Sequence, residues 1–141
     1  MFWDSSALVP LLLAEQRSAE MEALQGSDGD PAIWWTCQVE CQSAVYRRYR
    51  KAQFPPAILD QALKRLEELI EDADIIPPAD PLRRRAGRLL ALHPLSAADA
   101  LQLAAALVWC DEQPTGVSFI CLDDRLREAA RREGFHLLPR S

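Results

Sequence analysis

The stretch from Leu95 to Cys110 constrains the fold of this chain more than any other. It reads LSAADALQLAAALVWC, a run with high helix propensity that is apolar on nearly every face. A helix of this kind in a globular protein must be covered on several sides, so we expect a core helix. Only Asp99 and Gln102 are polar within the apolar run. A carboxylate near the start of a buried helix needs a hydrogen bond, a cation or a proton. The main question about function is therefore which of these partners Asp99 has.

Short apolar segments alternate with helical ones along the rest of the chain. Strands are predicted at residues 1–3, 32–35, 74–76, 117–122 and 135–138. Helices are predicted at 17–24, 37–50, 57–72, 81–92, 95–110 and 126–132, and after Asp4, where Pro10 makes the first helix short or kinked. This alternation predicts an α/β fold with a mainly parallel sheet. No repeat or linker divides residues 1–141, which we expect to form a single domain.

Composition excludes several classes of protein. No apolar run is long enough for a membrane span, and the N-terminus lacks the basic region and cleavage site of a signal peptide, so we expect a cytoplasmic protein. The net charge of −5 is unusual for a non-specific nucleic-acid binder, although arginines occur in clusters. The cysteines form no zinc motif, and His93 and His136 are isolated. We expect all four cysteines, and three of the tryptophans, to be core residues: Cys37, Cys41, Cys110, Cys121, Trp34, Trp35 and Trp109.

Four acidic residues occupy comparable positions. Asp4 follows the first predicted strand and Asp123 follows the strand at 117–122, while Glu40 and Asp99 lie near the first turns of helices. Binding sites of open α/β sheets lie beyond the carboxyl ends of the strands, so these four carboxylates are able to converge there. Each also has a purely structural explanation as a helix cap or first-turn acid, with Ser96 and Asp99 forming a capping box. Four converging carboxylates would favour a hard divalent cation, Mg²⁺ or Mn²⁺.

Four segments, in this order, resemble the PIN-domain nucleases, and most closely the VapC-type toxins of bacterial type II toxin–antitoxin pairs. The segments are FWDSSALV, VEC after AIWW, LSAADALQLAAAL and CLDDRLREAARREGF, and the resemblance covers essentially the whole chain. It implies a PIN-like three-layer α/β/α fold with a short-stranded central sheet. It also implies catalytic roles for Asp4, Glu40, Asp99 and Asp123. This chain departs from the family at Cys121, where threonine is common, and at Ser96, where a basic residue is common.

The resemblance further implies a Mg²⁺- or Mn²⁺-dependent endoribonuclease that hydrolyses RNA with a metal-activated water. Asp4, Asp99 and Asp123 would hold the metal, Glu40 would complete its shell directly or through water, and Ser5 or Ser6 would orient Asp4. The basic residues nearest the acidic motifs are the expected RNA contacts: Arg47, Arg48, Arg125 and Arg127. A homodimer and a cognate antitoxin are the expected protein partners.

Two other hypotheses remain open at the level of sequence. The chain is alternatively a catalytically silent PIN-like interaction module, whose acidic residues act only as helix caps. A phosphate-handling regulator of the receiver type also places aspartates at strand ends, but this chain has no lysine near its final strand.

Overall fold

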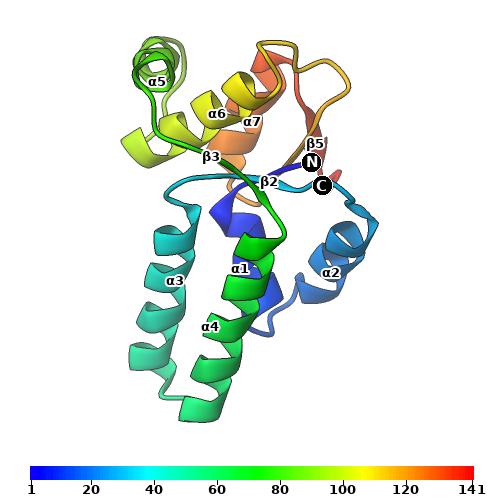
Figure 1. The fold of residues 1–141 in the computed structure, drawn as a ribbon, viewed down its shortest axis with the longest axis vertical. Helices are drawn as coiled ribbons and strands as arrows, with labels where there is room; N and C mark the ends of the chain where they lie inside the picture. Colours follow the sequence, from blue (N-terminus) through cyan, green and yellow to red (C-terminus); the bar gives the residue numbers. More distant parts are fainter.

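A computed structural model describes residues 1–141 and contains a single five-stranded sheet with seven helices (Figure 1). The strands are β1 (Phe2–Trp3), β2 (Ala32–Trp34), β3 (Asp74–Ile76), β4 (Ser118–Ile120) and β5 (His136–Leu138). They lie in the order β3-β2-β1-β4-β5, and all neighbouring pairs are parallel. The predicted α/β fold is therefore confirmed, and the sheet is parallel throughout rather than mainly so.

The helices fall close to their predicted ranges. They are α1 (Ser5–Leu12), α2 (Ser18–Ser27), α3 (Cys37–Ala52), α4 (Pro56–Glu71), α5 (Asp80–Leu92), α6 (Ala97–Trp109) and α7 (Asp124–Glu133). Pro10 lies inside α1, which has only eight residues, as expected for an early proline. The helix predicted at residues 17–24 does not end at Leu24 but continues through Gly26 to Ser27.

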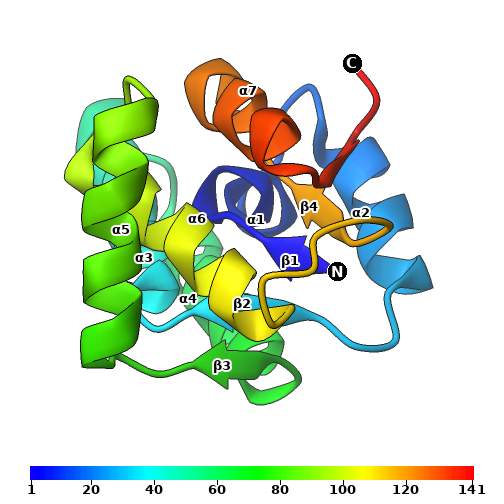
Figure 2. The same cartoon turned by 90° about the horizontal axis from the view of Figure 1, so that it is seen from above.

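The sheet separates two hydrophobic cores because successive strand residues point to opposite faces. Phe2 of β1 and Phe119 of β4 pack with α5, α6 and α7, which lie above the strands in Figure 1 and are seen from above in Figure 2. Trp3 and Ile120, their next neighbours in sequence, pack with α1, α2, α3 and α4 on the other face. This arrangement confirms the three-layer α/β/α sandwich.

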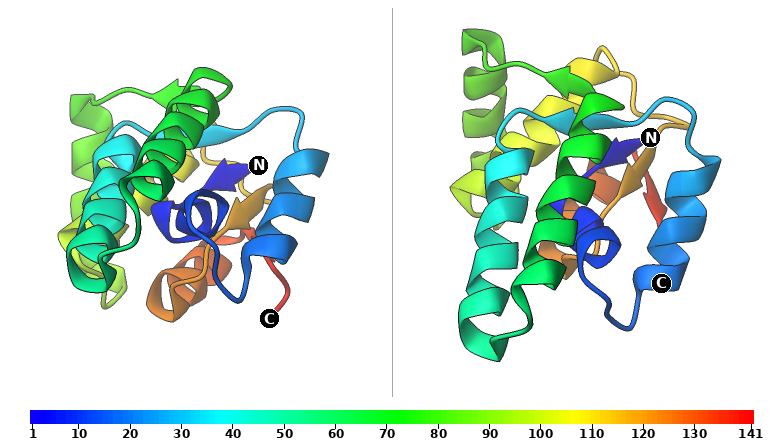
Figure 3. Two further views of the ribbon diagram at one scale, coloured as in Figure 1. Left: turned by 90° about the horizontal axis from the view of Figure 1, so that it is seen from below. Right: turned by 60° about the horizontal axis from the view of Figure 1, so that its bottom comes forward.

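The helices of the second face are arranged around α1. Figures 1 and 3 show α3 and α4 running side by side away from the sheet, and Figure 1 shows α1 between this pair and α2. The apolar stripe of α4 (Ala62, Leu66 and Leu69) is buried, as its helical spacing predicted. The start of α1 is thereby fixed directly beyond the end of the central strand.

The order of the strands defines where a site is expected. From β1 the chain moves outward through β2 and β3, then crosses back to β4 on the other side of β1. In open α/β sheets, ligands bind beyond the carboxyl ends of the strands where the order reverses. Here that position lies beyond β1 and β4, the two strands that precede Asp4 and Asp123.

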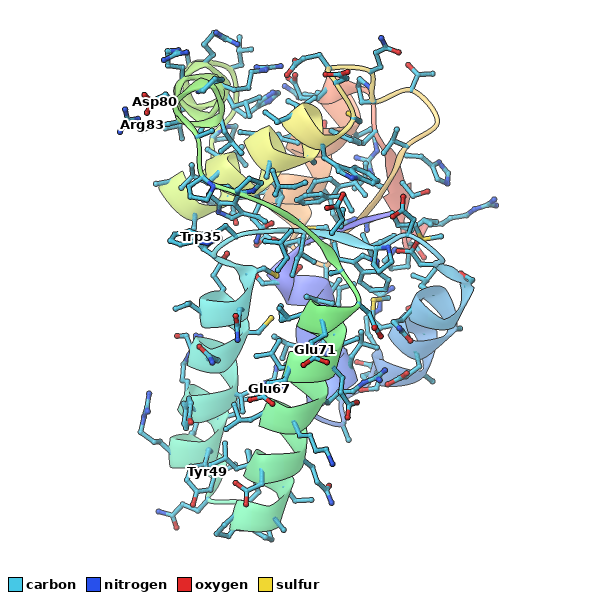
Figure 4. All side chains as sticks on the ribbon, viewed as in Figure 1. Trp35, Tyr49, Glu67, Glu71, Asp80 and Arg83 are labelled. Carbon is cyan, nitrogen blue, oxygen red and sulfur yellow. The ribbon has the colours of Figure 1, made fainter.

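Burial corrects four expectations about single residues. Trp35, predicted to be core, is 57% exposed at the start of α3 (Figure 4), since it lies beyond the end of β2. Trp109 and Cys110 are only partly buried, at the edge of the core, whereas the other three cysteines are buried. His93 is not isolated: its Nε2 lies 2.7 Å from Glu133 Oε2. No single helix has the length and apolarity to cross a membrane. Only α5 and α6 taken together reach that length and composition, and the chain bends by 118° between them.

Candidate active site

One open cleft gathers all four predicted catalytic carboxylates. It has a volume of about 550 Å³ and lies beyond the carboxyl ends of β1 and β4. Its walls come from the starts of α1, α3, α6 and α7. The residues that line it are Asp4, Ser5, Ser6, Val9, Thr36, Val39, Glu40, Ser43, Ala44, Arg47, Asp99 and Asp123. Segments from both ends of the chain and from its middle therefore meet at one place.

Asp4 is the most buried of the four, with 3% of its surface exposed. It is the N-cap of α1, where its Oδ2 accepts from the Ser6 backbone N–H at 3.1 Å and from the Ser6 hydroxyl. The Ser6 oxygen in turn accepts from the Leu122 backbone N–H at 3.0 Å. Ser6 thus joins the carboxyl end of β1 to the segment that follows β4, and it is the serine that orients Asp4.

Glu40 is held by three hydrogen-bond donors. Its Oε1 accepts from Thr36 Oγ1 at 2.9 Å and from Gln102 Nε2 at 3.0 Å. Its Oε2 accepts from the Ser5 hydroxyl at 3.4 Å. Ser5 therefore contacts Glu40 rather than Asp4. Thr36 lies at the N-cap position of α3 but makes no capping bond, because its hydroxyl donates to Glu40. These contacts fix one carboxylate with donors from three segments.

Asp99 and Asp123 lie at the starts of α6 and α7. Ser96 caps α6 by accepting from the Asp99 backbone N–H at 3.2 Å, as predicted. Asp123 caps α7, since its Oδ1 accepts from the Leu126 backbone N–H at 2.9 Å. Capping and lining of the cleft are therefore compatible, because a carboxylate has two oxygens and several lone pairs.

The electrostatics of the cleft are those of crowded negative charges. Burial, together with the charges of Asp99 and Glu40, raises the pKa of Asp4 from 3.8 to about 6, against the opposing bonds from Ser6. Partial burial raises the pKa of Glu40, and the charge of Asp99 raises it further. The three hydrogen bonds that Glu40 accepts oppose this shift. Partial burial and the charge of Asp123 raise the pKa of Asp99. Each carboxylate thus makes ionisation of its neighbours less favourable.

Cys121 occupies the place between Asp4 and Asp123. Its Sγ lies 3.7 Å from Asp4 Oδ2 and accepts from the Asp123 backbone N–H at 3.3 Å. Burial, followed by the charge of Asp4, raises the pKa of the thiol well above its usual range. The thiol therefore stays protonated and serves as a weak donor to Asp4.

The four arginines expected to contact RNA lie in different environments. Arg47 lines the cleft, and Arg48 forms an ion pair with Glu15 at 2.7 Å. Arg125 is exposed and lines a separate hollow on α7. Arg127 requires a correction: it is buried, and its guanidinium donates to the carbonyls of Cys121 and Pro139, both at 2.8 Å. Its guanidinium is occupied by two backbone carbonyls and is not accessible to RNA.

Two contributors to the site were not assigned from the sequence. Gln102 is fully buried and reaches Glu40 from the middle of α6, while its own Oε1 has no partner. The hydroxyl of Thr36 reaches the same carboxylate from the start of α3. The available signal for Gln102 was its position as the second polar residue in an apolar helix.

The donor set of the cleft fits a hard divalent cation. Asp4, Asp99 and Asp123 offer carboxylate oxygens, with Glu40 alongside, and no imidazole or thiolate competes with them. A cation here would relieve the repulsion that raises the pKa of Asp4, Glu40 and Asp99. No three such side chains are already close enough to form a complete cage. The fit is therefore to an ion such as Mg²⁺, which keeps several of its waters.

Comparison with known proteins assigns the chain to a family. The model of the PIN domain matches residues 1–132, so the chain belongs to the PIN domain family, which typically comprises nucleases that use divalent metals. No curated protein matches the sequence.

Two solved structures share the fold. One is described as a toxin–antitoxin complex from Klebsiella pneumoniae, with a TM-score of 0.61, 18% identity, and coverage of 86% of this chain and 85% of that chain. The other is PAE2754 from Pyrobaculum aerophilum, with a TM-score of 0.62, 19% identity, and coverage of 97% of this chain and 87% of that chain. At these identities, the similarity shows the fold alone.

Proposed function

We propose that this protein is a Mg²⁺- or Mn²⁺-dependent endoribonuclease whose active site is the acidic cleft. The observation that supports this most strongly is the convergence of Asp4, Glu40, Asp99 and Asp123 from four segments beyond the carboxyl ends of β1 and β4. Capping alone does not require this arrangement, because helix caps serve equally well when they face separate regions of solvent.

Each side chain has a distinct task in the proposed reaction. Asp4, Asp99 and Asp123 would hold the cation, and Glu40, fixed by Thr36, Gln102 and Ser5, would complete its shell directly or through a water. When bound, the ion supplies an acidified water and neutralises charge on the scissile phosphate. Ser6 and Cys121 keep the Asp4 carboxylate in position, and Arg47 at the wall offers a counter-charge to the phosphodiester.

The biological role proposed here is that of a toxin neutralised by a cognate antitoxin in the cytoplasm, with the toxin acting as a homodimer. It is supported by the family and by the shared fold of the toxin–antitoxin complex from Klebsiella pneumoniae. The reading frame beside the gene provides a test. A short neighbouring gene for a DNA-binding protein, whose product suppresses RNA cleavage when co-expressed, is expected; a neighbour whose product leaves cleavage unchanged contradicts the antitoxin assignment.

Catalysis is tested with a pool of single-stranded RNAs. We expect cleavage in Mg²⁺ or Mn²⁺ and none in EDTA. Asp99→Asn and Asp123→Asn should each reduce the rate by about a hundredfold or more, since each removes a metal-binding charge. Asp124→Asn is the matched control: Asp124 is the next residue and carries the same charge, but it lines a different hollow, so its rate should remain near that of the wild type.

Direct Mn²⁺ binding, followed by electron paramagnetic resonance, separates the ion from the reaction. Weaker binding by Asp99→Asn and Asp123→Asn, with Asp124→Asn unaffected, supports the assigned ligands. A wild-type protein that folds but cleaves no RNA in either metal would instead identify the chain as a catalytically silent PIN module.

A further inference from the structure

The acidic cleft continues into a second hollow along α3. This second hollow has a volume of about 360 Å³ and shares four lining residues with the cleft: Ser6, Val9, Ala44 and Arg47. Its remaining lining residues are Glu15, Arg48 and Lys51. The shared wall makes the two hollows one continuous groove, which is acidic beside the sheet and predominantly basic farther along α3.

The groove follows one face of α3. Glu40, Ala44, Arg47 and Lys51 are spaced three or four residues apart, so they lie one above another on successive turns. Arg47 and Lys51 are separated by about 6 Å along the helix axis, which is close to one step between phosphates of an extended nucleic-acid strand. The lower end of this face is held in place, because Tyr49 packs edge-on against Phe54 where α3 turns toward α4 (Figure 4).

The charges along the groove differ in availability. Arg48 is paired with Glu15 at 2.7 Å. Arg47 and Lys51 are exposed and form no ion pair within the protein. They are two unpaired cations beside a cluster of carboxylates in a chain whose net charge is −5. Because the carboxylates themselves repel phosphate, cations that flank the cleft are needed to attract the rest of a polyanion.

We propose that Arg47 and Lys51 form a phosphate-binding track that holds single-stranded RNA on one side of the scissile bond. The proposal rests on the nuclease function proposed above. The scissile phosphate lies at the acidic cleft, the next phosphate in that direction lies at Arg47, and the following one lies at Lys51. A single row of cations on one helix face matches one backbone, whereas a duplex presents two.

The last turn of α3 offers another explanation for Lys51. Basic residues there, Arg50 and Lys51, interact favourably with the negative end of the helix dipole. Arg50 is exposed in the same turn but does not line the groove, which makes it a matched control. If the dipole alone explains these residues, Arg50→Ala and Lys51→Ala will have the same consequences.

The experiment measures binding of a fluorescent single-stranded RNA to Asp99→Asn protein in Mg²⁺ over a range of salt concentrations. Adding Lys51→Ala or Arg47→Ala should weaken binding by roughly three- to tenfold and reduce the salt slope by about 0.7, the value for one lost phosphate contact. Adding Arg50→Ala should change neither quantity, and thermal unfolding checks that all variants fold. Equal effects of Lys51→Ala and Arg50→Ala, or tighter binding of duplex RNA, would overturn the track.

Cleavage by otherwise wild-type protein separates the track from the catalytic proposal. Lys51→Ala should raise KM and leave kcat nearly unchanged. This increase should disappear with substrates that are shortened on one side of the cut, which also identifies the side that binds α3. Cleavage with the same KM for Lys51→Ala and Arg50→Ala contradicts the track alone, whereas absence of wild-type cleavage contradicts the nuclease.

Discussion

At the scale of single residues, Gln102 links the core to the candidate active site. Its amide donates to Glu40 from a fully buried position, while its own oxygen has no partner. A buried acceptor without a partner costs stability, so an apolar residue at this position would make the fold more stable. The amide is therefore best explained by what it does for the Glu40 carboxylate.

Gln102→Leu should separate stability from activity. Leucine has a similar volume and removes the unpaired oxygen, so the free energy of unfolding should change by less than about 1 kcal/mol. The pKa of Glu40 should rise further because a donor to its charged form is lost. The acidic limb of the pH–rate profile should then move to higher pH. A large loss of stability with an unmoved profile would show that Gln102 is only structural.

Asp4 predicts a pH dependence of stability when no metal is bound. Its folded pKa of about 6 lies above its ordinary value of 3.8, so the folded state binds more protons between these values. Stability from this group is therefore present at low pH and is lost as pH rises through about 6. In EDTA, Asp4→Asn should be more stable than wild type by about 1–3 kcal/mol at pH 7.5.

This advantage of Asp4→Asn should vanish near pH 4, where Asp4 in the folded protein is neutral. Denaturant unfolding at both pH values measures the difference. Asp60→Asn is the control, because Asp60 is exposed and its replacement should change stability equally little at both pH values. Asp28→Asn is unsuitable because Asp28 pairs with the N-terminus. An unchanged difference between the two pH values would contradict the assigned cause.

At the scale of elements, the sequence predicted most of the fold because its periodicities are strong. The helical stripe of α4 and the apolar strand β4 each indicate one structure. Boundaries were harder: Gly26 costs a helix only about 1 kcal/mol, and α2 continues through it to Ser27. Trp35 was misassigned because a run of apolar letters does not reveal where the pairing of a strand ends.

The site was predictable only where a residue's place in an element fixes its position. Asp4 and Asp123 follow strands, and parallel strands end on one edge, so their proximity followed from topology. The contact between Gln102 and Glu40 joins residues 62 positions apart and depends on how α6 packs against α3. The burial of Arg127 similarly depends on the carbonyl groups that follow β4 and β5, which no spacing reveals.

Arg127 supplies a prediction about α7. Its guanidinium bridges carbonyl groups beyond β4 and β5, and lysine cannot donate in two fixed directions. Arg127→Lys should lower the free energy of unfolding by about 2–4 kcal/mol, because the backbone carbonyls lose donors that lysine cannot replace. Arg125→Lys, at an exposed position two residues earlier, should leave stability within about 0.5 kcal/mol. An unchanged free energy of unfolding in Arg127→Lys would contradict the structural role assigned to its guanidinium.

At the scale of the whole molecule, an ion bound in the cleft should raise the free energy of unfolding. Mg²⁺ or Mn²⁺ at a hundred times its dissociation constant should stabilise the protein by about 2.7 kcal/mol, seen as a higher Tm. The gain should be largest above pH 6, where Asp4 is ionised, and absent in Asp99→Asn. An equal gain from Mg²⁺ in both proteins would point to binding elsewhere.

The two hydrophobic cores have a consequence for how activity arises. Asp4 and Glu40 are carried by helices of one core, whereas Asp99 and Asp123 are carried by helices of the other. Neither helical layer contains all four carboxylates, so the proposed metal site is complete only while both layers are packed against the sheet. A substitution that loosens either layer, however remote from the carboxylates, should abolish the proposed activity at a temperature below the Tm of the whole chain.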